Sequence, residues 1–88
     1  MLYLLQYSNS VNLHNIIGAA YKGLGKLEEA ISAYQKAISI KPDYADAYLN
    51  LGIILNDLYK SQEAELSYRK AIEIRPNFSI AYWNLYGL

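Results

Sequence analysis

Residues 45–78, ADAYLNLGIILNDLYKSQEAELSYRKAIEIRPNF, repeat the pattern of residues 11–44, VNLHNIIGAAYKGLGKLEEAISAYQKAISIKPDY. A shift of 34 residues aligns identical residues along the whole unit, among them Gly18 with Gly52, Tyr34 with Tyr68 and Pro42 with Pro76. The same shift carries Asn50-Leu51 onto Asn84-Leu85, so residues 79–88 begin a third unit. A period of this length is typical of stacked repeats that bury their apolar faces on one another.

The apolar residues inside each unit recur at helical spacing. Leu13, Ile16, Ile17, Ala20 and Tyr21 follow the i, i+3, i+4, i+7, i+8 pattern of an amphipathic helix. Two such stretches fill each unit and no alternating strand pattern competes with them. The sequence therefore predicts an all-α fold with helices near residues 11–24, 27–40, 45–58, 61–74 and 79–88.

Helix boundaries are marked by residues that break or cap helices. Pro42 and Pro76 stop the second helix of each unit, and Gly25 separates the two helices of the first unit. Asp43 and Asn77 follow the prolines, where we expect them to cap the next helix.

Small residues indicate where helices cross closely. Gly18 and Gly52 lie where two helix axes are expected to approach, with Tyr34 or Tyr68 filling the space beside them. Enlarging Gly52 to leucine should therefore overpack the crossing and destabilise the fold.

Composition excludes several kinds of function. The 88 residues carry eight Lys/Arg, eight Asp/Glu and no cysteine, so neither nucleic acid nor an anionic membrane surface is an expected partner. All sixteen charges lie between Lys22 and Arg75, and both ends are uncharged.

The apolar start, residues 1–7, lacks a basic segment and is too short for a signal peptide or a spanning helix. We expect a cytoplasmic protein.

The sequence offers no catalytic or metal-binding motif. His14, the single histidine, occupies the same repeat position as Tyr48 and Tyr82, which favours a packing role. Neither a catalytic triad spacing nor a glycine-rich phosphate loop is visible. We therefore expect no enzyme activity, no cofactor and no bound metal. Tyr21, Tyr34, Tyr48, Tyr68 and Tyr82 are expected to pack between helices rather than to stack on RNA.

Gly18, Tyr21, Ala30, Tyr34, Ala37 and Pro42 resemble the signature of the tetratricopeptide repeat, and Gly52, Leu55, Ala64, Tyr68, Ala71 and Pro76 resemble it again. The resemblance implies an α-solenoid of antiparallel helix pairs, about two and a half units in a right-handed superhelix. The units would be residues 11–44 and 45–78, followed by 79–88 as the first helix of a truncated third unit. Residues 1–10 would be an apolar extension or the tail of a preceding helix.

The resemblance also implies a non-catalytic module that binds a peptide segment of another protein in a concave groove lined by the first helices. The groove positions would include polar and apolar side chains from all three units: Asn12, Asn15, Asp46, Leu49, Asn50, Ile53, Asn56, Trp83 and Asn84. Chaperone-binding members hold a C-terminal carboxylate with lysine, arginine and asparagine, and only Asn50 fits that clamp here. An asparagine ladder on the peptide backbone fits Asn50 and Asn84, but the first unit has Ile16 there.

Both ends of the chain lack the polar surface that usually closes a repeat array. The alternative function is therefore self-association through apolar ends, for which the candidate residues are Leu2, Leu4, Leu5, Ile80, Leu85 and Leu88. The same ends fit a piece of a longer array. Ser8 stands where the later units have proline, so the first helix could run on from near Leu2 to Leu24.

Overall fold

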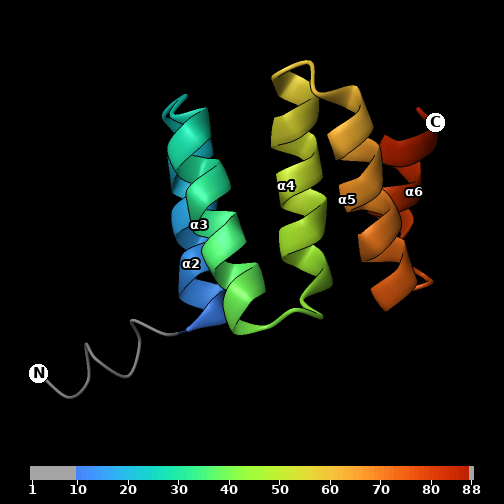
Figure 1. Cartoon of the computed structure of the whole chain (residues 1–88), viewed down its shortest axis with the longest axis horizontal. Coiled ribbons are helices and arrows are strands. Elements are labelled where there is room, and N and C mark those ends of the chain that lie inside the picture. Colours follow the sequence, from blue (N-terminus) through green and yellow to red (C-terminus); the bar gives the residue numbers. More distant parts are fainter. Residues whose placement is uncertain (1–9, 88) are drawn as a thin grey trace, which may run out of the picture.

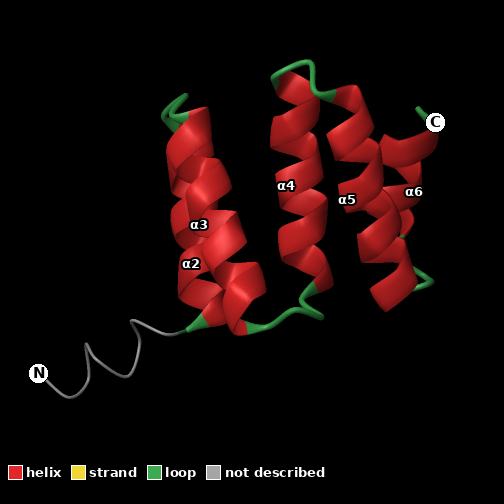
Figure 2. Ribbon diagram, viewed as in Figure 1, coloured by secondary structure: helices red, strands yellow, loops and turns green. Residues whose placement is uncertain are grey.

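The structure, a computed structural model, describes residues 10–87 and arranges them as an array of helices without strands (Figure 1). The helices are α2 (Val11–Gly23), α3 (Leu27–Ile40), α4 (Ala45–Asp57), α5 (Ser61–Ile74) and α6 (Ser79–Tyr86). Short turns join helices that are neighbours along the chain (Figure 2). Each helix also packs on the next one, and α2 contacts α4. The predicted all-α solenoid of antiparallel helix pairs is confirmed.

The core lies between the helix pairs and repeats with the sequence. Ala30, Ala37, Ala64 and Ala71 are buried at the same positions of the two units, and they belong to α3 and α5. Their small side chains leave room for large neighbours, as the complete burial of Ile54 illustrates. Alternation of small and large residues thus fills the core in both units.

Gly18 and Gly52 lie at the two close helix crossings that the sequence predicts. A Cβ atom on Gly18 would lie 2.5 Å from Tyr34 Cε1, and one on Gly52 would lie 2.6 Å from Tyr68 Cε1. Both tyrosines are buried, with 1% and 4% of their surface exposed. The ring of the second helix therefore rests directly on the backbone of the first, which leaves no room for a side chain there.

The first helix begins later than one of the sequence hypotheses allowed. Ser10 is the N-cap of α2: its backbone is extended, and its Oγ accepts a hydrogen bond of 3.3 Å from the Leu13 amide. The hypothesis of one helix from Leu2 to Leu24 is therefore wrong, because the extended backbone of Ser10 interrupts it. Residues 1–9 themselves lie outside the described residues.

The predicted caps Asp43 and Asn77 are also wrong. The N-cap positions of α4 and α6 belong to Tyr44 and Phe78, and neither helix receives a side-chain cap hydrogen bond. A tight turn places these aromatic residues instead, because the amide of Tyr44 donates to the Lys41 carbonyl at 3.0 Å. Phe78 makes the same bond to Arg75, whose guanidinium lies 4.3 Å from the Phe78 ring centre.

The turn inside each unit requires a left-handed backbone. Gly25 adopts φ +77° between α2 and α3, and Tyr59 adopts φ +63° at the equivalent place between α4 and α5. Tyr59 is 93% exposed, so packing does not compensate for its conformation. The second unit therefore keeps the turn of the first without the glycine that favours it.

Candidate functional site

The first helices α2, α4 and α6 carry the predicted groove residues, and polar side chains connect α2 with α4. Asn50 Nδ2 donates to Asn15 Oδ1 at 3.0 Å, which joins α4 to α2. Tyr44 donates its hydroxyl proton to Asn12 Oδ1 at 2.8 Å. Burial, and to a smaller degree the charge of Asp46, raise the pKa of the Tyr44 hydroxyl.

An ion pair occupies the equivalent place in the second unit, between the start of α4 and the end of α5. Arg75 NH1 lies 3.3 Å from Asp46 Oδ1, and both side chains are about half exposed. Asp46 follows Asn12 by one repeat, so both units use this position for a polar link from the first helix to the residues after the second helix.

The predicted groove residues differ in accessibility. Asn12, Asn56, Trp83 and Asn84 are exposed, whereas Asn15, Asp46, Asn50 and Ile53 are partly buried. Asn84 donates to the Ile80 carbonyl of its own helix at 2.8 Å. The chain therefore brings amides from three successive first helices to accessible positions.

Leu49 was predicted to line the groove, but the structure places it in the core. It is only 6% exposed and belongs to the apolar core, so it lies beneath the groove surface. Ile53 also packs against the core but keeps part of its surface accessible. Apolar contact to a ligand on α4 would therefore come from Ile53 and not from Leu49.

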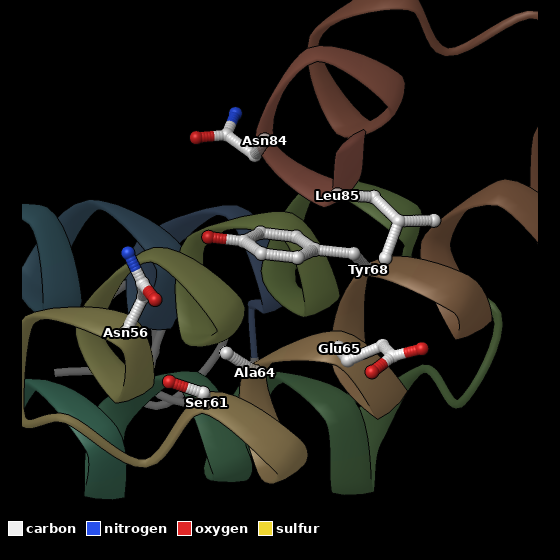
Figure 3. Close-up of a pocket in the computed structure, with 7 residues that line it drawn as sticks. All are labelled: Asn56, Ser61, Ala64, Glu65, Tyr68, Asn84 and Leu85. Atoms are coloured by element: carbon white, nitrogen blue, oxygen red, sulfur yellow. The ribbon is translucent and has the colours of Figure 1, made fainter. Parts of the chain in front are cut away.

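A polar pocket of about 210 Å³ opens beside the end of α6 (Figure 3). Residues of α4, α5 and α6 line it: Asn56, Ser61, Ala64, Glu65, Tyr68, Asn84 and Leu85. Figure 3 shows the Tyr68 ring crossing the pocket with its hydroxyl directed toward the Asn56 side. Burial, and then the charge of Asp57, raise the pKa of this hydroxyl.

Ser61, Glu65 and Tyr68 were not among the predicted site residues. A comparison between the repeats carried the signal, because Leu27 and Ile31 stand where Ser61 and Glu65 stand one unit later. Leu27 and Ile31 pack against the core in the first unit. The second unit is therefore polar at two positions where the first is apolar.

The outer side of α6 carries exposed apolar side chains opposite its buried side. Ala81 is fully buried and Leu85 packs against the core, whereas Ile80, Trp83 and Tyr86 are 55%, 59% and 57% exposed. Among the predicted self-association residues, Ile80 is thus accessible and Leu85 largely is not. Leu2, Leu4, Leu5 and Leu88 lie outside the described residues.

His14 lies half-buried on α2, beside residues of α3. With Ile17, Tyr21 and Ala33 it borders an open hollow of about 470 Å³. In residues 10–87, His, Asp and Glu side chains do not gather into a group able to hold a metal ion. Over the same residues, none of the helices has the length and apolar character required to cross a membrane.

Two family models match the chain. A model described as TPR repeat matches residues 18–58, and one described as tetratricopeptide repeat matches residues 45–78. Together they span residues 18–78, which include most of the first unit and all of the second. A search of curated protein sequences finds no significant match.

Solved structures with a similar fold also match the chain. Two crystal structures of MamA are 34% and 31% identical to the chain, with TM-scores of 0.85 and 0.86. They cover 88% and 94% of this chain, which spans 45% of each of theirs. The first TPR of Spaghetti (RPAP3), solved with the HSP90 peptide SRMEEVD, is 28% identical with a TM-score of 0.86. That alignment covers 91% of this chain and 64% of the Spaghetti chain.

Proposed function

This chain belongs to the tetratricopeptide repeat family, and on that premise we propose that it binds an extended peptide segment of a partner protein along α2, α4 and α6. The observation that carries the proposal is the series of amides on successive first helices, of which Asn50 is partly buried and Asn84 is exposed. Asn50 and Asn84 are one repeat apart, and an amide both donates and accepts hydrogen bonds. Two amides at this spacing suit the backbone of an extended strand.

The Spaghetti structure supports peptide binding by this fold, since that relative was solved with a peptide. The chemistry of this chain differs from a carboxylate clamp, however. Lys22 is the one lysine or arginine on the described helices α2, α4 and α6. We therefore propose a partner segment held through its backbone and apolar side chains, with Ile53 on α4 as the apolar contact.

Peptide selection from a random display library on the full chain tests the proposal. The double variant Asn50→Ala, Asn84→Ala should weaken selected peptides by about fivefold or more, since each lost hydrogen bond is worth roughly 0.5–1.5 kcal/mol. Gln35→Ala on the exposed side of α3 is the matched control and should leave affinity unchanged. Equal affinity of the double variant and the control would refute binding along the groove.

A second candidate function is self-association through the outer side of α6. The exposed side chains of Ile80, Trp83 and Tyr86 support it, because apolar groups this close together commonly mark an interface. Two copies could pack these sides against each other around a twofold axis. Sedimentation over a concentration series should then reveal a dimer that Ile80→Glu abolishes, and a strictly monomeric chain at micromolar concentration would refute it.

A further inference from the structure

The pocket beside the end of α6 contains the hydroxyl group of Tyr68, a residue that is otherwise buried. Tyr68 is 4% exposed, and its hydroxyl makes no hydrogen bond to any described residue. Because no buried side-chain oxygen in residues 10–87 is left unsatisfied, the hydroxyl reaches the accessible space of the pocket. Figure 3 shows it directed into that space, between Asn56 and Asn84. A nearly buried tyrosine usually satisfies its hydroxyl, so this group is available to a ligand.

The remaining polar groups of the pocket are rich in acceptors. Asn84 Nδ2 donates a hydrogen bond to the Ile80 carbonyl, so its Oδ1 can still accept a hydrogen bond from a ligand. Glu65 uses Oε1 for both contacts with Arg69, at 2.9 and 3.0 Å, so Oε2 makes no contact with a described residue. No lysine, arginine or histidine is among the residues lining the pocket. The pocket thus offers a ligand several acceptors and no cation.

Asp57 adds a charge that local structure does not explain. It is the last residue of α4, where a carboxylate faces the negative end of the helix dipole. It is exposed and makes no salt bridge with a described residue. It follows Asn56 of the pocket lining, and its charge contributes to the raised pKa of the Tyr68 hydroxyl. Its position costs stability, which suggests a role in binding.

The size of the pocket limits what can enter it. Its volume of about 210 Å³ lies below the range of roughly 300–1,000 Å³ that drug-sized ligands occupy. It suits one long side chain rather than a cofactor. The pocket also opens beside Asn84, one of the amides proposed to hold the peptide backbone.

We propose that this pocket receives one basic side chain, lysine or arginine, of the segment bound along the first helices. The inference rests on the proposed function and specifies the chemistry of its ligand. Tyr68 and Asn84 accept hydrogen bonds from the ammonium or guanidinium group, and Asp57 supplies the compensating charge. Glu65 does not share this contact, because its carboxylate points away from the Tyr68 hydroxyl in Figure 3 and pairs with Arg69. An acidic tail such as the SRMEEVD peptide of the Spaghetti structure meets the wrong charge here.

Peptides selected from a random display library on the full chain provide the probe. They should share a lysine or arginine at one position, and its replacement by glutamine should weaken binding about threefold or more. Asp57→Asn should cause the same loss, and the loss should not grow when both changes are combined. Asp43→Asn, an exposed carboxylate in the loop before α4, is the matched control and should change nothing.

Asp57→Asn should not unfold the chain, since it removes a charge that opposes the helix dipole. Tyr68→Phe, with its thermal unfolding measured in parallel, tests the hydroxyl independently and should weaken the same peptides. Peptides that bind without a basic preference, or equally to Asp57→Asn and Asp43→Asn, overturn the pocket inference but leave the proposed function standing. A selection that yields no binding peptide overturns both.

Discussion

The crossing of α4 and α5 at Gly52 gives the sharpest test of the fold, and Gly52→Ala is the smallest change that probes it. The new Cβ would lie 2.6 Å from Tyr68 Cε1 and 2.8 Å from Cδ1, closer than such atoms can approach. Tyr68 cannot swing aside freely, because it is 4% exposed and belongs to the core. Either the ring or the helix axis must move.

Two opposing effects set the size of the change. Alanine favours a helix over glycine by about 1 kcal/mol, whereas overpacking a core costs about 1–3 kcal/mol. Gly52→Ala should therefore lose up to about 2 kcal/mol of unfolding free energy. Gly52→Leu, with a longer side chain in the same place, should lose at least about 1–3 kcal/mol.

Gly23→Ala is the matched control for helix propensity. Gly23 is also helical, at the end of α2, but nothing lies within 4 Å of its ideal Cβ. It should gain up to about 1 kcal/mol, so the two alanine variants should differ by about 1–3 kcal/mol. Thermal unfolding followed by circular dichroism resolves this, because about 1 kcal/mol shifts the Tm of a domain this size by roughly 4–8 °C.

A double-mutant cycle with Tyr68 assigns the cost to the contact. In a Tyr68→Leu background the ring is gone, and Gly52→Ala should become neutral or stabilising. If Gly52→Ala raises Tm as much as Gly23→Ala does in the parent chain, the close crossing does not exist and the packing scheme is wrong.

Three further predictions concern the turn at Tyr59, the core residue Leu49 and the buried tyrosines Tyr34 and Tyr68. Tyr59→Gly should raise the unfolding free energy by up to about 1 kcal/mol, because Tyr59 holds φ +63° without compensating burial; a lower Tm would contradict this. Leu49→Ala should cost about 2–5 kcal/mol as a core truncation; a change in peptide affinity without loss of stability would return Leu49 to the groove. Since the raised pKa values of Tyr34 and Tyr68 are folded-state values, stability should be unaffected below about pH 10 and fall as pH rises through them. Denaturant titrations of the parent chain and of the double variant Tyr34→Phe, Tyr68→Phe between pH 8 and 11 should show a shallower fall for the variant.

Most of the fold could be predicted from the 34-residue period, because each packing contact recurs at the equivalent position of the second unit. Gly18 with Tyr34 and Gly52 with Tyr68 are the same contact in two units, and either alone would have been ambiguous. The caps were predicted wrongly because Asp43 and Asn77 are good cap residues by propensity. The turn after each proline instead places Tyr44 and Phe78 at the N-cap, and tertiary packing of these aromatic rings overrode local preference.

The site was less predictable, because equivalent positions in successive units meet different neighbours. Asn50 on α4 donates a hydrogen bond to Asn15 on α2, the first helix of the preceding unit. The residue that Asn84 would meet in the same way is Leu49, which is buried. Asn84 turns to its own backbone at Ile80 instead and remains exposed. Two asparagines that look identical in the repeat therefore differ in what they can still offer a ligand.

The same reasoning explains why the pocket lies at the second unit. Ser61 and Glu65 replace the apolar Leu27 and Ile31, while the tyrosine beside them is kept. The ring of Tyr68 still fills the core, but the residues beside it are now polar. The Tyr68 hydroxyl is therefore directed into the pocket (Figure 3). Repeat identity thus preserves the fold through the ring of Tyr68, and repeat divergence around its hydroxyl creates the place where binding specificity can arise.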